Sequence, residues 1–83
     1  MSKDIVTVEK ISLAFARAER LMTQEELVGA ADIGIATISR VERGESLTML
    51  TAQKILYGLN LKGQELGLPI LKLDDLEWNV KGL

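Results

Sequence analysis

One stretch decides the fold of this chain, residues 23–44, which reads TQEELVGAADIGIATISRVERG. Thr23 and Glu26 have the spacing of a capping box, in which each side chain accepts the backbone amide of the other. The box starts a helix of about eight residues. Asp32, which tolerates a left-handed backbone, stands where the chain must turn. Gly34 can cap a second helix, and the last Gly of the stretch can end it. The stretch therefore predicts two short helices joined by a tight turn.

The second helix has two different faces when its residues are placed at about 100° intervals. Ile38, Val41 and Glu42 cluster on the inner side. The outer side is small near the N-terminus of the helix and basic near its C-terminus, and consists of Ala36, Ser39, Arg40 and Arg43, with Ile35 at its border. Such a face can approach a groove closely and meet phosphates, as a helix in the DNA major groove must.

The stretch resembles the helix-turn-helix of the XRE, or lambda-repressor-like, family of bacterial and phage regulators. That family's pattern is Ser/Thr-Gln-Glu-Glu-Leu-Ala, a turn, and Thr-Ile-Ser-Arg-Ile-Glu-Arg-Gly, and residues 23–27 and 37–44 match it in type and spacing. With flanking helices, the similarity covers roughly residues 8–66. It implies an all-α, compact, four- to five-helix DNA-binding domain over residues 1–68. An apolar C-terminal tail, residues 69–83, follows and could contain a short strand.

Four positions depart from the family pattern. The turn contains Asp32, where the family usually has Gly. The second helix opens with Gly34, Ile35 and Ala36, where the family usually has a Ser or Thr cap followed by polar residues. Fewer hydrogen bonds to base edges are then available, so readout would depend more on thymine methyl groups and DNA shape. The departures affect sequence specificity and not the fold.

The resemblance also implies roles for polar side chains outside this face. In the family, an Arg seven residues before the Gln pairs with the Glu of the Glu-Arg-Gly triplet, so Arg17 is expected to pair with Glu42. The alternative is a solvated Arg17, because it projects about 160° from Phe15 on an ideal helix. Gln24, at the first turn of its helix, is expected to hydrogen-bond a DNA phosphate, with simple surface exposure as the alternative.

Composition excludes several function classes. The 83 residues suffice for one domain and contain neither Cys nor His. Disulfides, thiolate or imidazole metal sites, and Cys–His or Ser–His–Asp catalysis are therefore excluded. We predict no catalytic residue, metal or cofactor, and no enzyme activity. Because the chain lacks an apolar run of about 18 residues and a signal-peptide core, we expect a cytoplasmic protein without a membrane association.

The net charge of −2 argues mildly against nucleic-acid binding. The position of the charges matters more, because attraction to phosphate falls off within about 10 Å. Arg40 and Arg43 share one helix face, whereas a group of acidic residues comes late in the chain, at Glu65, Asp74, Asp75 and Glu77. We therefore expect a DNA-binding protein of modest non-specific affinity.

Apolar spacing predicts helices on both sides of the motif. The first runs from a Thr7 cap to about Leu21. Its expected core stripe is Val8, Ile11, Phe15, Ala18 and Met22. The helix after the motif has a Thr48 cap and is expected to stop near Asn60. Its expected core stripe is Met49, Ala52, Ile55, Leu56 and Leu59. A last short helix could follow at residues 63–66.

The tail is unusually apolar for the end of a chain. Alternation of apolar and polar residues from Leu71 to Val80 predicts a strand or an extended arm. A lone edge strand is unstable unless it pairs, and exposed apolar patches usually mark a contact. We therefore expect Leu73, Leu76 and Trp78 to contact a second copy or a partner protein. Alternatively, the tail folds back over its own domain, with Trp78 in a surface groove.

The leading functional hypothesis is a small repressor-type regulator that binds double-stranded DNA sequence-specifically, as a homodimer. Its recognition helix, residues 34–43, would read the major groove, with Arg40 contacting guanine. The other expected DNA contacts are Gln24, Ile35, Ala36, Thr37, Ser39 and Arg43. A second hypothesis is an antitoxin that binds both DNA and a partner protein through the apolar tail. A third is a protein-binding module on a helix-turn-helix scaffold, favoured by the acidic balance and the apolar start of the recognition helix.

Overall fold

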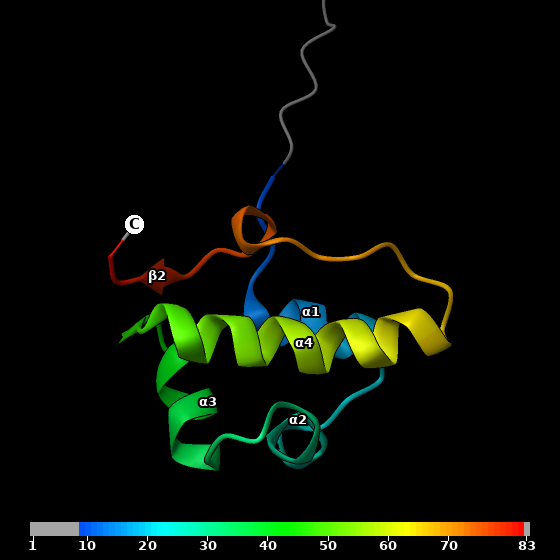
Figure 1. Ribbon diagram of the computed structural model, residues 1–83, viewed down its shortest axis with the longest axis horizontal. Coiled ribbons are helices and arrows are strands. Elements are labelled where there is room, and N and C mark those ends of the chain that lie inside the picture. Colours follow the sequence, from blue (N-terminus) through cyan, green and yellow to red (C-terminus); the bar gives the residue numbers. More distant parts are fainter. Residues whose placement is uncertain (1–8, 83) are drawn as a thin grey trace, which may run out of the picture.

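The computed structural model describes residues 9–82, and these contain four α-helices, one 3-10 turn and two short strands. In chain order they are α1 (Leu13–Glu19), α2 (Gln24–Ala31), α3 (Ile35–Glu42), β1 (Ser46–Leu47), α4 (Met49–Glu65), η1 (Leu73–Asp75) and β2 (Asn79–Val80). Figure 1 shows α4 along the length of the molecule, with α2 and α3 on one side and the C-terminal segment on the other. The all-α fold predicted from the sequence is confirmed, with a small two-stranded piece added.

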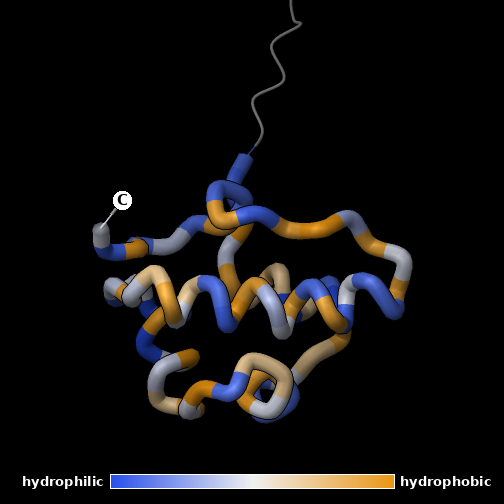
Figure 2. The backbone as a smooth tube through the Cα atoms, viewed as in Figure 1, coloured by the Kyte–Doolittle hydropathy of each residue, from blue (hydrophilic) through white to orange (hydrophobic). Residues whose placement is uncertain are grey.

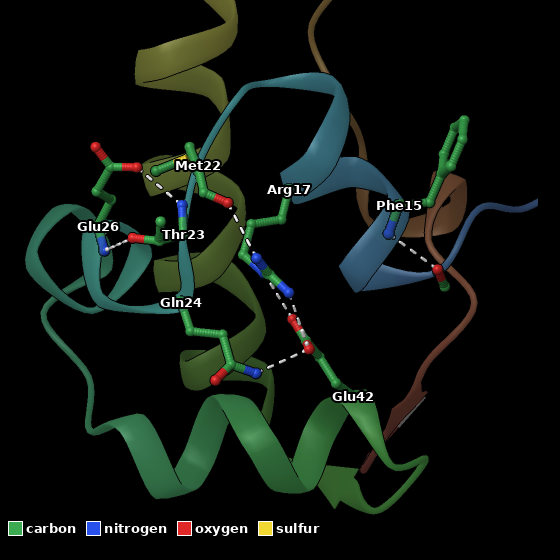
Figure 3. Close-up of polar contacts among 8 residues, drawn as sticks. Phe15, Arg17, Met22, Thr23, Gln24, Glu26 and Glu42 are labelled. Carbon is green, nitrogen blue, oxygen red and sulfur yellow. Dashed lines mark hydrogen bonds and ion pairs between the residues drawn. The ribbon is translucent and has the colours of Figure 1, made fainter.

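The helix-turn-helix forms with the expected local contacts. Thr23 Oγ1 accepts the Glu26 amide at 3.0 Å, and Glu26 Oε1 accepts the Thr23 amide at 2.8 Å (Figure 3). Asp32 ends α2 in the left-handed region, at φ 58° and ψ 51°. Gly34 caps α3 without any side-chain hydrogen bond, and Gly44 has a φ of 95° directly after α3. The two helices and their turn therefore follow from interactions within a few residues.

The start of α1 is later than predicted. The helix is capped by Ser12, whose Oγ accepts the Phe15 amide at 3.0 Å. The predicted cap, Thr7, lies outside the described residues. Ile11 is extended because its backbone forms a parallel bridge with Leu76 of the C-terminal segment. Pairing with this distant segment therefore replaces the helical turn that the apolar spacing predicted.

The buried face of α1 also differs from the prediction. Phe15 is 52% exposed and Ala18 faces solvent, whereas Leu13 and Ala16 are buried. Val8, the first member of the predicted stripe, lies outside the described residues. The prediction counted apolar residues only, but the inward face of this helix also carries two arginines, at positions 17 and 20. Of the predicted stripe, Met22 is buried and Ile11 packs against the core, whereas Phe15 and Ala18 were wrong because long basic side chains share the interior.

Arg20 is buried, with only 2% of its surface exposed. Its Nη1 donates to the Ala16 carbonyl at 3.1 Å and to Glu19 Oε1 at 3.3 Å, and its Nε has no hydrogen-bond partner. Gly63 of α4 makes room for the guanidinium, because a Cβ there would lie 3.1 Å from Arg20 Nε. This glycine lies within α4, which continues to Glu65 in place of a separate last helix.

Asn60 connects α4 to the C-terminal segment. The prediction that Asn60 stops the helix was wrong, because its side chain bonds the C-terminal segment. Its Nδ2 donates to the Leu71 carbonyl at 3.0 Å, and its Oδ1 accepts the Leu71 amide at 2.8 Å. These two hydrogen bonds hold the C-terminal segment against α4. Figure 2 shows that this segment contains apolar residues after the end of the helix.

The end of the described chain pairs with the loop after the recognition helix. β1 and β2 are parallel, with Ser46 opposite Asn79 and Leu47 opposite Val80. Since Leu47 and Val80 are both buried, the pair closes one end of the core. The whole core is aliphatic and consists of Leu13, Ala16, Met22, Leu27, Ala31, Ile38, Val41, Leu47, Ala52, Ile55, Leu59, Leu76 and Val80.

The expected partner contact of the tail needs correction. Leu76 is 1% exposed and belongs to the core of its own chain, so it presents no surface to a second copy or a partner protein. Leu73 and Trp78 are half-buried against the same core, and Trp78 Nε1 donates to the Leu73 carbonyl at 3.1 Å. The tail therefore folds back over its own domain, as in the alternative hypothesis, because its apolar side chains complete the core that the four helices form.

Candidate DNA-binding surface

The two faces of α3 separate as its sequence predicts. Ile38 and Val41 are buried against the other helices. Thr37 and Ser39 are half-buried at the edges of the helix. The outer face presents four exposed residues, Ile35, Ala36, Arg40 and Arg43. The structure thus brings the predicted contact residues of α3 onto one side of the molecule.

The first turn of the outer face is apolar. Gly34 has no side chain, and Ile35 and Ala36 carry no hydrogen-bonding group. The nearest hydroxyl, Thr37 Oγ1, lies 3.5 Å from Arg40 Nη2. A Cβ added at Gly34 would meet nothing within 4 Å, so packing does not require glycine at this cap. The first turn therefore offers a smooth, apolar and accessible surface.

The C-terminal part of the outer face is basic, but an acidic side chain lies against it. Glu45, in the loop after α3, accepts from Arg43 Nη2 at 3.2 Å, and its other carboxylate oxygen lies 3.9 Å from Arg40 Nε. All three side chains are solvent-exposed, and such surface pairs contribute about 0–1 kcal/mol. A phosphate can therefore replace the carboxylate. Sequence reasoning missed Glu45, although its position two residues after Arg43 was a signal.

A network of polar side chains holds α3 against α1 and α2 (Figure 3). Arg17 makes two hydrogen bonds to Glu42, from Nε to Oε2 at 2.9 Å and from Nη2 to Oε1 at 3.2 Å. Its third nitrogen, Nη1, donates to the Met22 carbonyl at 3.0 Å. The Arg17 and Glu42 side chains are only 19% and 13% exposed. One guanidinium therefore connects α1 both to α3 and to the chain before α2.

The geometric objection to this ion pair does not hold in the structure. It assumed that Phe15 faces inward, which would turn Arg17 away from Glu42. Phe15 is exposed instead, and the opposite side of α1 carries Arg17 toward α3 (Figure 3). The ion pair is therefore compatible with an ordinary, straight helix.

Gln24 takes part in the same network. Its Nε2 donates to Glu42 Oε1 at 2.9 Å, and its side chain is half-buried. An amide nitrogen has two N–H donors, so one remains for a phosphate oxygen. The structure therefore shows a contact of Gln24 with Glu42 that sequence reasoning missed, and the phosphate contact stays a prediction.

Other site types find no support in the described part of the chain. Residues 9–82 contain no group of three or more carboxylates placed to hold a metal ion. None of their helices combines the length and the apolar character that crossing a bilayer requires.

The fold and this outer face define a helix-turn-helix protein. A helix-turn-helix family model matches residues 13–66, well over half of the 83-residue chain. The chain therefore belongs to the XRE, or lambda-repressor-like, helix-turn-helix family, as the sequence motifs predicted. At the level of this family, it is a DNA-binding transcription regulator. No match to this chain was found among curated proteins or among solved structures.

Proposed function

We propose that this protein is a repressor that binds a specific double-stranded DNA site with α3 in the major groove. The observation that carries the proposal is the fixed position of α3. The Arg17–Glu42 ion pair and Gln24 hold its inner side, while Arg40 and Arg43 remain accessible on its outer side. A rigid helix with a basic outer face can enter the groove without reorganising. Bound at a promoter, the protein would act by occupancy, for which no chemistry is needed.

The contacts divide into two classes. Arg40, on the outer face of α3, is proposed to pair with guanine, since a guanidinium can donate to O6 and N7 together. Arg43 and Gln24 are proposed to hold phosphates, which set the register of the protein on the duplex. Thr37 and Ser39 are proposed as secondary contacts at the edges of the helix.

A homodimer is the proposed binding unit, because two helices one DNA turn apart read a near-palindromic site. With the tail folded back, the most evident surface for a second copy is on α4. Three exposed side chains there fall within about 40° of one another around the helix, namely Leu50, Tyr57 and Leu61.

The dimer surface on α4 can be tested with Tyr57→Lys. This variant is expected to shift the protein from dimer to monomer in sedimentation measurements.

Fluorescence anisotropy tests the proposal. Duplexes selected from a random library would be titrated with wild-type protein, Arg40→Ala and Lys72→Ala, each at two salt concentrations. We expect Arg40→Ala to weaken binding to the selected duplex by about five- to 150-fold. Lys72→Ala removes an equal charge from the C-terminal segment, on the opposite side of α4 from α3 (Figure 1), and should have little effect. Binding should weaken steeply with salt, because phosphate contacts release counterions. Absence of binding at low salt would contradict the proposal.

The two other hypotheses lose support from the structure. The antitoxin hypothesis depended on an exposed apolar tail, but Leu76 and Val80 are buried in their own domain. The protein-binding hypothesis depended on the acidic balance and on the apolar start of α3, and this apolar start lies on the same face as two arginines. A protein complex formed through that apolar turn would depend weakly on salt, so the same titrations distinguish it from DNA binding.

A further inference from the structure

We propose that the first turn of α3 reads the C5 methyl group of pyrimidines, in thymine or 5-methylcytosine, through Ile35 and Ala36. This inference rests on the proposed function, because it requires α3 to lie in the major groove. It goes further by naming the chemical group that the apolar part of the helix recognises.

The exposed side chains in the first turn of α3 can contact a base mainly through apolar atoms. Ile35 is 43% exposed although its neighbour Ile38 is fully buried, so its side chain projects from the domain. Ala36 is exposed, and Gly34 adds no side chain before them. Thr37 is half-buried, and its hydroxyl already lies 3.5 Å from Arg40 Nη2. In this turn, direct hydrogen-bond readout by side chains is therefore replaced by apolar contact.

The largest apolar group in the major groove is the thymine methyl group. The other edge groups are hydrogen-bond donors or acceptors, apart from the small C5–H of cytosine and C8–H of purines. A donor or acceptor covered by the Ile35 side chain would lose its water without gaining a partner, which costs free energy. A methyl group in the same place loses nothing and gains apolar contact. The side chain thus favours thymine and disfavours an unmethylated cytosine.

Charge complementarity identifies DNA as the occupant of this apolar turn. Arg40 and Arg43 follow on the same outer face, one and two helical turns further along. A partner protein with an apolar surface would have to cover these cations, whereas a DNA groove is flanked by phosphates that attract them. The apolar turn and the basic turns together match a methyl group deep in the groove and phosphates at its edge.

Base substitution tests the inference without altering the protein. In the selected duplex, each thymine would be replaced in turn by uracil, which lacks only the methyl group. We expect uracil at one or two positions per half-site to weaken binding about three- to tenfold, as expected for one buried methyl group. Exchange of the same base pair to C·G should weaken binding as well, and 5-methylcytosine at that position should restore part of the affinity.

A variant then assigns the effect to the proposed side chain. In Ile35→Ala, the same thymine-to-uracil replacement should change affinity less than twofold. Ile70→Ala, which makes the same truncation at an exposed position in the C-terminal segment, should retain the full uracil effect. Tight binding without any uracil-sensitive position would overturn the inference and leave the proposed function standing. An undiminished uracil effect in Ile35→Ala would overturn the role of this side chain. Absence of DNA binding altogether would overturn both proposals.

Discussion

Arg17 connects α1 both to α3 and to the chain before α2 through one guanidinium. It bonds Glu42 of α3 twice and the carbonyl of Met22 once, and Gln24 of α2 completes the shell around the carboxylate. Removal of one member of a mostly buried pair leaves the other charge with too few partners, which costs more than the pair contributes. This makes the network testable by stability measurements.

Arg17→Ala is expected to lower the free energy of unfolding by about 2–3 kcal/mol, because Glu42 would keep Gln24 as its sole side-chain donor. Urea denaturation followed by circular dichroism measures the change. Arg43→Ala, which breaks an exposed pair with Glu45, is the matched control and should cost less than about 0.5 kcal/mol. Equal losses in the two variants would show that the Arg17 network does not hold α3.

Glu45 is the acidic residue that lies against Arg40 and Arg43 on the outer face of α3, so its removal should affect affinity. Glu45→Gln frees Arg40 and Arg43 and takes a negative charge away from the phosphates. We expect non-specific DNA affinity at low salt to rise about three- to tenfold, in line with an electrostatic change of about 1 kcal/mol. Anisotropy titrations with a random-sequence duplex measure it, and Glu65→Gln at the end of α4 controls for net charge. An unchanged affinity would mean that Glu45 lies away from the bound DNA.

The connection between α1 and α2 requires one residue with a left-handed backbone, and that residue is a leucine. Leu21 has a φ of 56°, a left-handed conformation that disfavours a side chain with a Cβ. It is also 74% exposed, so little packing compensates for the strain. This turn is needed to bring α2 back along α4, and the residue present suits it poorly.

Leu21→Gly is therefore expected to raise the free energy of unfolding by about 0.5–1 kcal/mol, because glycine adopts positive φ without steric cost. Gln53→Gly, at an exposed position within α4, should lower it by a similar amount, because glycine loses more backbone freedom in a helix. Urea denaturation of the two variants compares them directly. A loss of stability in Leu21→Gly would mean that the exposed leucine makes contacts worth more than the strain.

Elements differ in how well their sequence predicted them. The capping box at Thr23 and the turn at Asp32 formed as expected, since their contacts lie within a few residues. The start of α1 was wrong because Ile11 pairs with Leu76, and no local signal marks that pairing. The stop predicted at Asn60 was wrong for the same reason, because its amide bonds the distant Leu71.

At the scale of the whole molecule, the tail completes the domain. Leu76 lies in the core, while Ile70, a few residues earlier, is exposed. Leu76→Ala is expected to cost about 2–4 kcal/mol in the free energy of unfolding, through lost burial and the cavity left behind. Ile70→Ala, with the same loss of apolar atoms from the surface, should cost less than about 0.5 kcal/mol. Urea denaturation measures both.

The stability of Leu76→Ala distinguishes a tail that belongs to the core from a tail that docks elsewhere. If the tail were an arm that docks elsewhere, Leu76→Ala would leave domain stability unchanged. Limited proteolysis would then remove the segment after Gly67 without unfolding the rest. A single cooperative transition that moves to lower urea in Leu76→Ala supports a tail that belongs to the core.

The sequence by itself determined the helix-turn-helix, the family and the two faces of α3, because caps, turns and helical periodicity act between residues close in the chain. Only the tertiary structure decided which side of α1 is buried, that Gln24 bonds Glu42, and that Glu45 lies beside the arginines. The tertiary structure also decided where the tail packs. Its apolar residues could cover any apolar surface, and they pack against the core of their own domain.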